Sequence, residues 1–300
     1  MATLEISNLS KTYGNGVKAL DDISLNIGNG MFGLLGPNGA GKSTLMRTLA
    51  TLQNADSGSA FLNGIDILAD PEALRRVLGY LPQEFGVYPR ITAEQLLDHV
   101  AILKGITHKK ERKELVHYLL QKVNLFEKKS KSVKGFSGGM KQRVGIAQAL
   151  IGDPKLIIVD EPTAGLDPGE RNRFHNLLAD VGEDVIVILS THIVDDVREL
   201  CVDMAIMNQG RIMYNGSPIE VLDEIKGMVW QKTIERNSLS QYMTDYEVIS
   251  DKMVAGKPQI NVLSKTLPGE GFKQVEPSLE DVFFTKINAR IYSLPSRMMK

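Results

Sequence analysis

The chain has 300 residues, of which 43% are hydrophobic and 24% charged, and a formal net charge of −1. This composition is typical of a soluble globular protein, and the balanced charge gives no reason to expect nucleic acid or an anionic membrane surface as the main partner. The single cysteine, Cys201, excludes an internal disulfide and favours a reducing cytoplasm. No apolar run reaches the roughly 18 residues that cross a bilayer, and the first residues do not resemble a signal peptide.

The first 90 residues alternate short apolar segments with turns. Period-two alternation or short apolar runs predict strands, and a helix follows the glycine-rich turn after the third of them. The predicted strands are Leu4–Leu9, Ile23–Ile27, Met31–Leu35 and Val77–Leu81, and the predicted helix is Ser43–Leu52.

The middle of the chain changes to helical periodicity and then returns to buried strands. Apolar residues at three- and four-residue spacing predict the helices Ala93–Leu103, Lys110–Val123 and Met140–Ile151. Leu156–Val159 and Val185–Leu189 are continuous apolar runs, the pattern of parallel strands buried on both faces. We therefore expect a mainly parallel α/β core with a helical insert at about residues 92–151.

The last part of the chain is less regular. Short strands are predicted at Met228–Ile234, Glu247–Val254 and Gln259–Leu263, and Ser278 and Asp281 have the spacing of a capping box at the start of a helix. We expect two domains, residues 1–218 and a small α+β appendage at residues 219–300.

The segment from Gly36 to Ser43 matches the P-loop pattern G-x-x-x-x-G-K-S in full. Glycines let backbone N–H groups approach a chain of phosphates, and the following helix directs its partial positive end at the same anion. Lys42 adds a full charge for the β- and γ-phosphates, and the Ser43 hydroxyl suits Mg²⁺. Because a predicted strand precedes the motif and a predicted helix follows it, a glycine-rich turn without function is a poor alternative.

Two acids end the apolar strand after the helical insert. Side chains alternate along a strand, so Asp160 and Glu161 diverge. Asp160 is expected to reach Mg²⁺, and Glu161 to lie by the γ-phosphate and polarise the attacking water.

A second anion site is predicted at Ser137-Gly138-Gly139, where Ser137 is a suitable N-cap for the next helix. In this position the segment resembles the Leu-Ser-Gly-Gly-Gln signature of ATP-binding-cassette (ABC) ATPases, with Phe136 and Met140 as departures. The resemblance covers about residues 2–218. It implies a P-loop NTPase α/β fold with a mainly parallel sheet, an antiparallel β-subdomain and a helical subdomain.

The resemblance also assigns roles to isolated residues. Tyr13 matches the aromatic residue that stacks on adenine, Gln83 the glutamine that senses Mg²⁺ and the membrane partner, and His192 the switch histidine. The loop Ala164–Asp167 matches the one that communicates between two cassettes. The implied cofactors are ATP and Mg²⁺. The predicted nucleotide-binding residues are Tyr13, Gly36, Pro37, Asn38, Gly39, Ala40, Gly41, Lys42, Ser43, Thr44, Ser137, Gly138 and Gly139. The predicted metal-binding residues are Ser43, Gln83 and Asp160, and the predicted catalytic residues are Glu161, His192, Lys42 and Gln83.

Members of this family work as paired cassettes, with each ATP between one P-loop and the other subunit's signature. The resemblance therefore implies a homodimer or paired cassette, peripheral on the cytoplasmic face of the membrane. It would power a separate integral membrane permease that docks near Gln83–Gln95 and the helical insert. The tail Pro277–Phe284 looks like the ending of ABC-2 exporters of drugs, antibiotics or lipids. The alternatives are an importer ATPase, a soluble ABC protein acting on ribosomes or DNA, and a small-molecule kinase.

Overall fold

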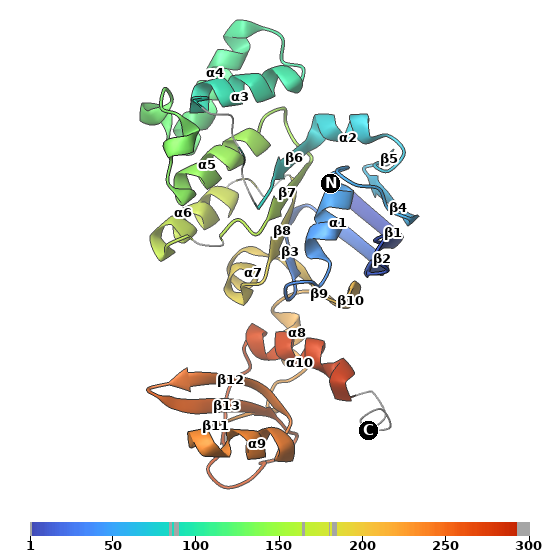
Figure 1. The fold of residues 1–300 in the computed structure, drawn as a ribbon, viewed down its shortest axis with the longest axis vertical. Coiled ribbons are helices and arrows are strands. Elements are labelled where there is room, and N and C mark those ends of the chain that lie inside the picture. The colour runs from blue at the N-terminus through green and yellow to red at the C-terminus, as the bar shows by residue number, and fades with distance from the viewer. Residues whose placement is uncertain are drawn as a thin grey trace. The chain divides into compact units, whose positions relative to one another are not determined.

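The computed structural model describes residues 2–83, 86, 90–163, 166–179, 181 and 185–292. The chain divides into two compact units, Met1–Ile212 and Met213–Lys300, with the boundary inside a strand. Each unit is described by itself (Figure 1). The sequence-based domain boundary at residue 218 stays a prediction.

The first unit contains a six-stranded sheet with the order β10-β9-β3-β8-β7-β6. The pairs β3–β8, β3–β9, β6–β7 and β7–β8 are parallel, as the apolar runs predict. Its strands are β3 (Gly30–Leu35), β6 (Leu78–Leu81), β7 (Leu156–Asp160), β8 (Ile186–Thr191), β9 (Asp203–Asn208) and β10 (Arg211–Gly216). Because β3 and β8 pair at Leu35 and Thr191, and β7 and β8 at Asp160 and Ser190, the residues that follow these strands meet at one edge.

The second sheet of this unit is antiparallel and four-stranded, with the order β2-β1-β4-β5. Its strands are β1 (Thr3–Thr12), β2 (Lys18–Gly28), β4 (Ser57–Leu62) and β5 (Ile65–Asp66), of which the last two were not predicted from the sequence. The antiparallel β-subdomain expected from the resemblance is therefore present. Helix α1 (Lys42–Leu49) contacts both sheets, and α2 (Pro71–Val77) connects β5 to β6.

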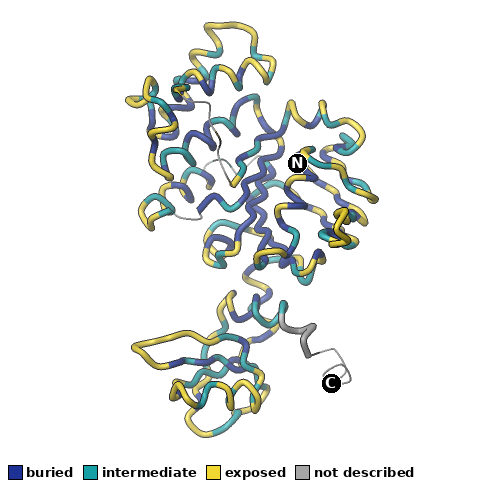
Figure 2. Tube along the Cα trace, in the orientation of Figure 1, coloured by how far each residue is buried: buried dark blue, intermediate teal, exposed yellow. Residues whose placement is uncertain are grey.

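Helices cover both faces of the six-stranded sheet, with α1 on one face and α5 and α6 on the opposite face. Ile158 and Ile188 pack on the side of α1, whereas Ile157 and Val187 pack against α5 (Gly138–Ala149) and α6 (Pro168–Ala179). Figure 1 shows α1 on one side of the central strands and α5 and α6 on the other, and Figure 2 shows that these strands are almost continuously buried. Helix α7 (Val194–Leu200) follows β8 and contacts β3.

The helical insert has a hydrophobic core of its own. It contains α3 (Ala93–Leu103), α4 (Lys109–Lys122), the 3₁₀ helices Phe126–Lys128 and Val133–Gly135, and α5. The predicted bounds of α3 are confirmed, and Thr92 and Gln95 form a capping box at its start. Helix α5 begins two residues before the predicted start, because Ser137 caps it and both glycines adopt helical geometry.

The second unit is α+β. Its antiparallel sheet has the order β12-β13-β11-β14. Its elements are α8 (Glu220–Asp223), β11 (Val229–Thr233), the 3₁₀ helix Arg236–Ser238, α9 (Leu239–Asp245), β12 (Val248–Val254), β13 (Lys257–Leu263), β14 (Lys273–Gln274) and α10 (Leu279–Tyr292). The predicted capping box forms: the Asp281 carboxylate accepts from the Ser278 backbone N–H at 2.9 Å, and the Ser278 hydroxyl accepts from Asp281 N–H at 3.2 Å. Among the described residues of both units, no helix has the length and apolar character required to cross a membrane.

Candidate active site

The P-loop connects β3 to α1, and two of its glycines have no space for a side chain. A Cβ on Gly36 would lie 2.4 Å from the Met207 carbonyl oxygen, and one on Gly41 would lie 2.3 Å from that of Ala19. Gly41 also has φ 106°, a left-handed conformation that favours glycine. These contacts pack the loop against β9 and β2 directly before α1, whose first backbone N–H groups have no intrahelical acceptor.

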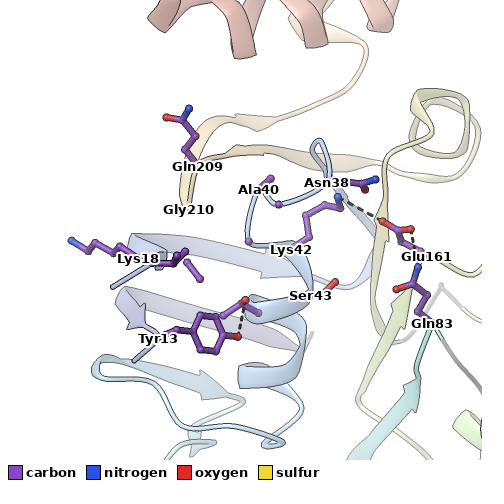
Figure 3. A pocket seen from close by; sticks show the side chains of 15 residues that line it. Tyr13, Lys18, Asn38, Ala40, Lys42, Ser43, Gln83, Glu161, Gln209 and Gly210 are labelled. Atoms are coloured by element: carbon purple, nitrogen blue, oxygen red, sulfur yellow. Dashed lines mark hydrogen bonds and ion pairs between the residues drawn. The ribbon is translucent and has the colours of Figure 1, made fainter. Parts of the chain in front are cut away.

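A cavity of about 710 Å³ opens beside this loop (Figure 3). It collects residues from five separate stretches of the chain: Tyr13, Val17, Lys18, Ala19, Asn38, Gly39, Ala40, Gly41, Lys42, Ser43, Thr44, Gln83, Glu161, Gln209 and Gly210. Sequence reasoning missed Val17, Lys18, Ala19, Gln209 and Gly210, which lie in loops and strand ends without a motif. Of the predicted site residues, Gly36, Pro37, Asp160, His192 and Ser137–Gly139 do not line the cavity.

Lys42 is almost fully buried at the base of the cavity. Its Nζ donates to the carbonyl oxygens of Gly36 at 2.7 Å and Pro37 at 3.2 Å. It also lies 3.7 Å from Glu161 Oε1. Burial lowers the pKa of Lys42, whereas the charges of Glu161 and Asp160 act in the opposite direction. A desolvated cation held by carbonyl groups beside a cavity is well placed to bind an incoming anion.

The Glu161 carboxylate is the point where the four predicted catalytic residues meet. Gln83 Nε2 donates to Glu161 Oε2 at 3.3 Å, and His192 Nδ1 lies 3.4 Å from the same oxygen. Lys42 approaches the other oxygen. Glu161 has φ 45°, which is uncommon for a residue with a side chain, and its N–H donates to the Ser190 carbonyl at 2.9 Å.

Asp160 ends β7 and is buried behind the cavity, with 4% of its surface exposed. Burial raises its pKa, as does the charge of Glu161, whereas the hydroxyls of Ser190 and Ser43 and the charge of Lys42 act against the rise. Within the described part of the chain, Asp160 Oδ1 has no hydrogen-bond partner. This oxygen and the hydroxyl of Ser43 are hard ligands that fit Mg²⁺. The described residues contain no group of three or more His, Cys, Asp or Glu side chains suited to a metal, but Mg²⁺ bound with phosphates needs only one or two protein ligands.

Tyr13 directly follows β1, and hydrogen bonds of its hydroxyl group fix the position of its ring. The Tyr13 hydroxyl lies 3.1 Å from Thr44 Oγ1 and donates to Gln53 Oε1 at 3.2 Å. In Figure 3 its ring lies beside the start of α1. A partly exposed ring at the rim of a cavity is suited to stack on a planar base.

The second predicted anion site lies at the start of α5. Ser137 Oγ accepts from Met140 N–H at 3.3 Å, which confirms the predicted N-cap. Ser137 and Gly138 are exposed, whereas Gly139 packs against Glu170. Phe136, the departure from the signature, is buried in the core of the helical insert. Ala164 and Gly165 of the predicted communication loop lie outside the described residues.

Comparison with known proteins identifies similar chains. Residues 20–164 match the family model described as ABC transporter. The chain is 35% identical to the probable multidrug ABC transporter ATP-binding protein YbhF of Escherichia coli, over 84% of this chain and 46% of that protein. It therefore spans about half the length of that relative.

Other relatives are matched over all or most of their length. Identity is 32% to the uncharacterized ABC transporter ATP-binding protein YxlF of Bacillus subtilis, over 95% of this chain and 100% of the relative. Identity is also 32% to the Nod factor export ATP-binding protein I of Rhizobium etli, over 94% of this chain and 92% of that relative. Among solved structures, the dimeric post-hydrolysis state of the ATP-binding cassette MJ0796, bound to ADP and Pi, has a TM-score of 0.66 and 26% identity, and the match covers 71% of this chain and 98% of that one.

Proposed function

The chain belongs to the ABC transporter family of ATP-binding proteins, and we propose that it binds ATP beside the P-loop and hydrolyses it with Glu161 as general base. The observation that carries the proposal is the convergence of Lys42, Gln83 and His192 on the Glu161 carboxylate. Groups that bind phosphate, orient water and accept a proton are thereby collected at one point.

Nucleotide binding uses the P-loop and the aromatic rim. The N–H groups at the start of α1 and the Lys42 ammonium bind the phosphates, and the Tyr13 ring stacks on the base. When a phosphate accepts from Lys42 Nζ, it replaces the carbonyls of Gly36 and Pro37 and leaves Glu161 free for water. A volume of about 710 Å³ is in the range of small-molecule sites.

Mg²⁺ would be held by Ser43, Asp160 and Gln83, and when bound it neutralises charge on the β- and γ-phosphates. The unpartnered Oδ1 of Asp160 supports this assignment, because a buried carboxylate oxygen without a donor is costly unless a cation approaches.

Hydrolysis is an in-line displacement at the γ-phosphorus. The water oxygen forms the new bond, the bond to the bridging oxygen breaks, and ADP leaves with the electron pair. Glu161 accepts the proton of the attacking water, His192 and Gln83 orient the water and the γ-phosphate, and Lys42 stabilises the developing negative charge.

The second half of the site comes from another cassette. Ser137, Gly138 and Gly139 do not line the cavity of their own chain, and the first two are exposed at the positive end of α5. This arrangement suits contact with the γ-phosphate held by a second copy. The ATP would then join two cassettes, and its hydrolysis would release them.

We infer that this cycle powers export through a separate integral membrane subunit on whose cytoplasmic side the chain sits. The names of relatives such as the Nod factor exporter support export, and the C-terminal Pro277–Phe284 segment supports the ABC-2 subclass.

The substitution Glu161→Gln tests the catalytic assignment. The amide keeps the shape but cannot accept the proton, so ATP turnover measured by phosphate release should fall to background while ATP binding persists. Full hydrolysis by the Glu161→Gln variant would rule out Glu161 as the base.

A further inference from the structure

A buried carboxylate, Asp196, lies close to the segments that carry the site and has no role in the chemistry described above. It belongs to the first turn of α7, and 0% of its surface is exposed. Burial removes the hydration of a charged carboxylate, which is costly unless hydrogen-bond donors replace the water. The donors around Asp196 therefore show which parts of the chain it joins.

One oxygen of Asp196 contacts the segment after β7 and the last residue of β8. Oδ2 accepts from the hydroxyl of Thr163 at 2.6 Å and from that of Thr191 at 3.1 Å. Both threonines are buried. Thr163 lies two residues after Glu161, and Thr191 immediately precedes His192.

The other oxygen holds α6. Arg171 Nε donates to Asp196 Oδ1 at 2.8 Å, and His175 Nε2 lies 2.9 Å from the same oxygen. The other ring nitrogen of His175 lies 3.1 Å from Glu199 Oε2. One carboxylate thus connects α6, α7 and both segments that carry site residues. Hydrogen bonds to a charged acceptor are about twice as strong as neutral ones.

Glu161 needs such support because its backbone is strained. A residue with a side chain at φ 45° is strained and persists only where its surroundings fix it. The bond from Glu161 N–H to the Ser190 carbonyl fixes one end of the turn. The Thr163 hydroxyl, bound to Asp196, fixes the other end.

We propose that Asp196 is a positioning residue, which fixes the Glu161–Thr163 and Thr191–His192 segments against each other so that Glu161 and His192 meet the same γ-phosphate. The proposal rests on the ATPase function proposed above. Because Asp196 acts through the two threonine hydroxyls, loss of either hydroxyl moves a site residue without removing any group that touches ATP.

Thr163→Val tests the proposal in the full chain, since valine keeps the shape of threonine and removes only the hydroxyl. We expect kcat for ATP to fall by about 10- to 100-fold, the range that small misplacements of reacting groups produce. KM for ATP should stay within about twofold, because the binding groups are untouched. Thr163→Ser, which keeps the hydroxyl, should restore most of kcat, and adding Asp196→Asn to Thr163→Val should cost much less than the two separate losses combined.

Glu199→Gln is the matched control, because it changes only the outermost contact of the cluster, at His175. It should keep wild-type kcat and thermal midpoint. Thr163→Val with wild-type kcat would overturn the proposal. So would an equal loss in Glu199→Gln, or a loss in Thr163→Val that serine does not restore. If Thr163→Val does not fold, Thr191→Val, measured against Thr191→Ser, replaces it.

The proposed function fails differently. In that case the wild-type chain would not hydrolyse ATP, or Glu161→Gln would hydrolyse it fully. The positioning proposal fails when wild type is active, Glu161→Gln is inactive and the threonine variants match wild type.

Discussion

Two glycine-containing loops of the first unit each lead into a helix, and among the described residues the large cavity beside Glu161 is lined by the first loop and not by the second. The loop before α1 lies beside Lys42, Glu161 and Gln83 and lines a cavity of about 710 Å³. The loop before α5 presents Ser137 and Gly138 to solvent. The nearby cation of α5, Arg143, is directed to the Val123 carbonyl at 3.4 Å and to Glu170 at 3.5 Å.

The two helix starts differ in the side chains that other elements place beside them. At α1, the parallel strands β3, β6 and β7 bring Lys42, Gln83 and the Asp160-Glu161 pair, respectively, to the same edge. At α5, Ser137, Gly138 and Gly139 do not line the cavity beside Glu161, and we propose that their phosphate is brought by another copy. Substitutions in the two loops should therefore differ in their effects on ATP binding and on turnover.

The largest effect is expected at the loop before α1. Lys42→Ala removes the cation that stabilises the transition state, so turnover should fall by about 100- to 1,000-fold, and ATP affinity should fall with it. Phosphate release and nucleotide titration measure the two losses. Lys18→Ala is the control: Lys18 also lines the cavity but is half exposed and paired with Asp21, so its loss should change turnover little. Equal losses in both variants would contradict the role of Lys42.

A substitution in the loop before α5 should lower ATP turnover without lowering ATP affinity. Gly138→Asp places a negative charge at the exposed start of α5, where the second copy's phosphate would lie. We expect turnover to fall by about 100-fold, as for loss of an oxyanion donor, while ATP affinity of the single chain is retained. A matching loss of ATP affinity would mean that both loops act on one nucleotide within one chain.

A smaller effect is expected at the rim of the cavity. Tyr13→Ala removes base stacking worth about 0.5–1.5 kcal/mol, so KM for ATP should rise by about 2- to 12-fold with kcat nearly unchanged. Tyr13→Phe keeps the ring but loses the hydroxyl contacts with Thr44 and Gln53, so its KM should lie between wild type and Tyr13→Ala. Unchanged KM in Tyr13→Ala would exclude stacking.

The smallest effect is expected for the departure from the signature. Phe136→Leu changes a buried residue of the helical insert, so it should cost about 1–1.5 kcal/mol of unfolding free energy and leave turnover near wild type. Denaturant unfolding measures the change in unfolding free energy, and phosphate release measures turnover. A large change in turnover without loss of stability would place Phe136 at the nucleotide instead of in the core.

Contiguous motifs explain why much of the candidate site could be located from the sequence. The P-loop and the Asp160-Glu161 pair each occupy one short stretch, and the strand and helix around them have clear periodicity. The end of α1 was predicted three residues too late: the helix stops at Leu49, and Thr51 turns into the left-handed region at φ 57°.

Features that depend on tertiary arrangement could not be predicted. Lys18 and Gln209 line the cavity only because β2 and the β9–β10 turn lie beside the P-loop. Helix α6 was not predicted from the sequence, because it begins with the polar segment Pro168–Arg173 and its apolar residues have only weak helical spacing. The partners of Asp196 are up to 33 residues away in sequence, so no local pattern reveals them.

The central claim is that ATP joins the P-loop of one copy to the start of α5 in another. Light scattering of Glu161→Gln measures this directly, since the blocked base prevents hydrolysis from releasing the dimer. We predict a doubled mass with ATP and Mg²⁺, a single-chain mass without nucleotide, and a single-chain mass with ATP when Gly138→Asp is added. A Glu161→Gln chain that binds ATP yet stays single, or a dimer that persists with Gly138→Asp, would contradict the claim.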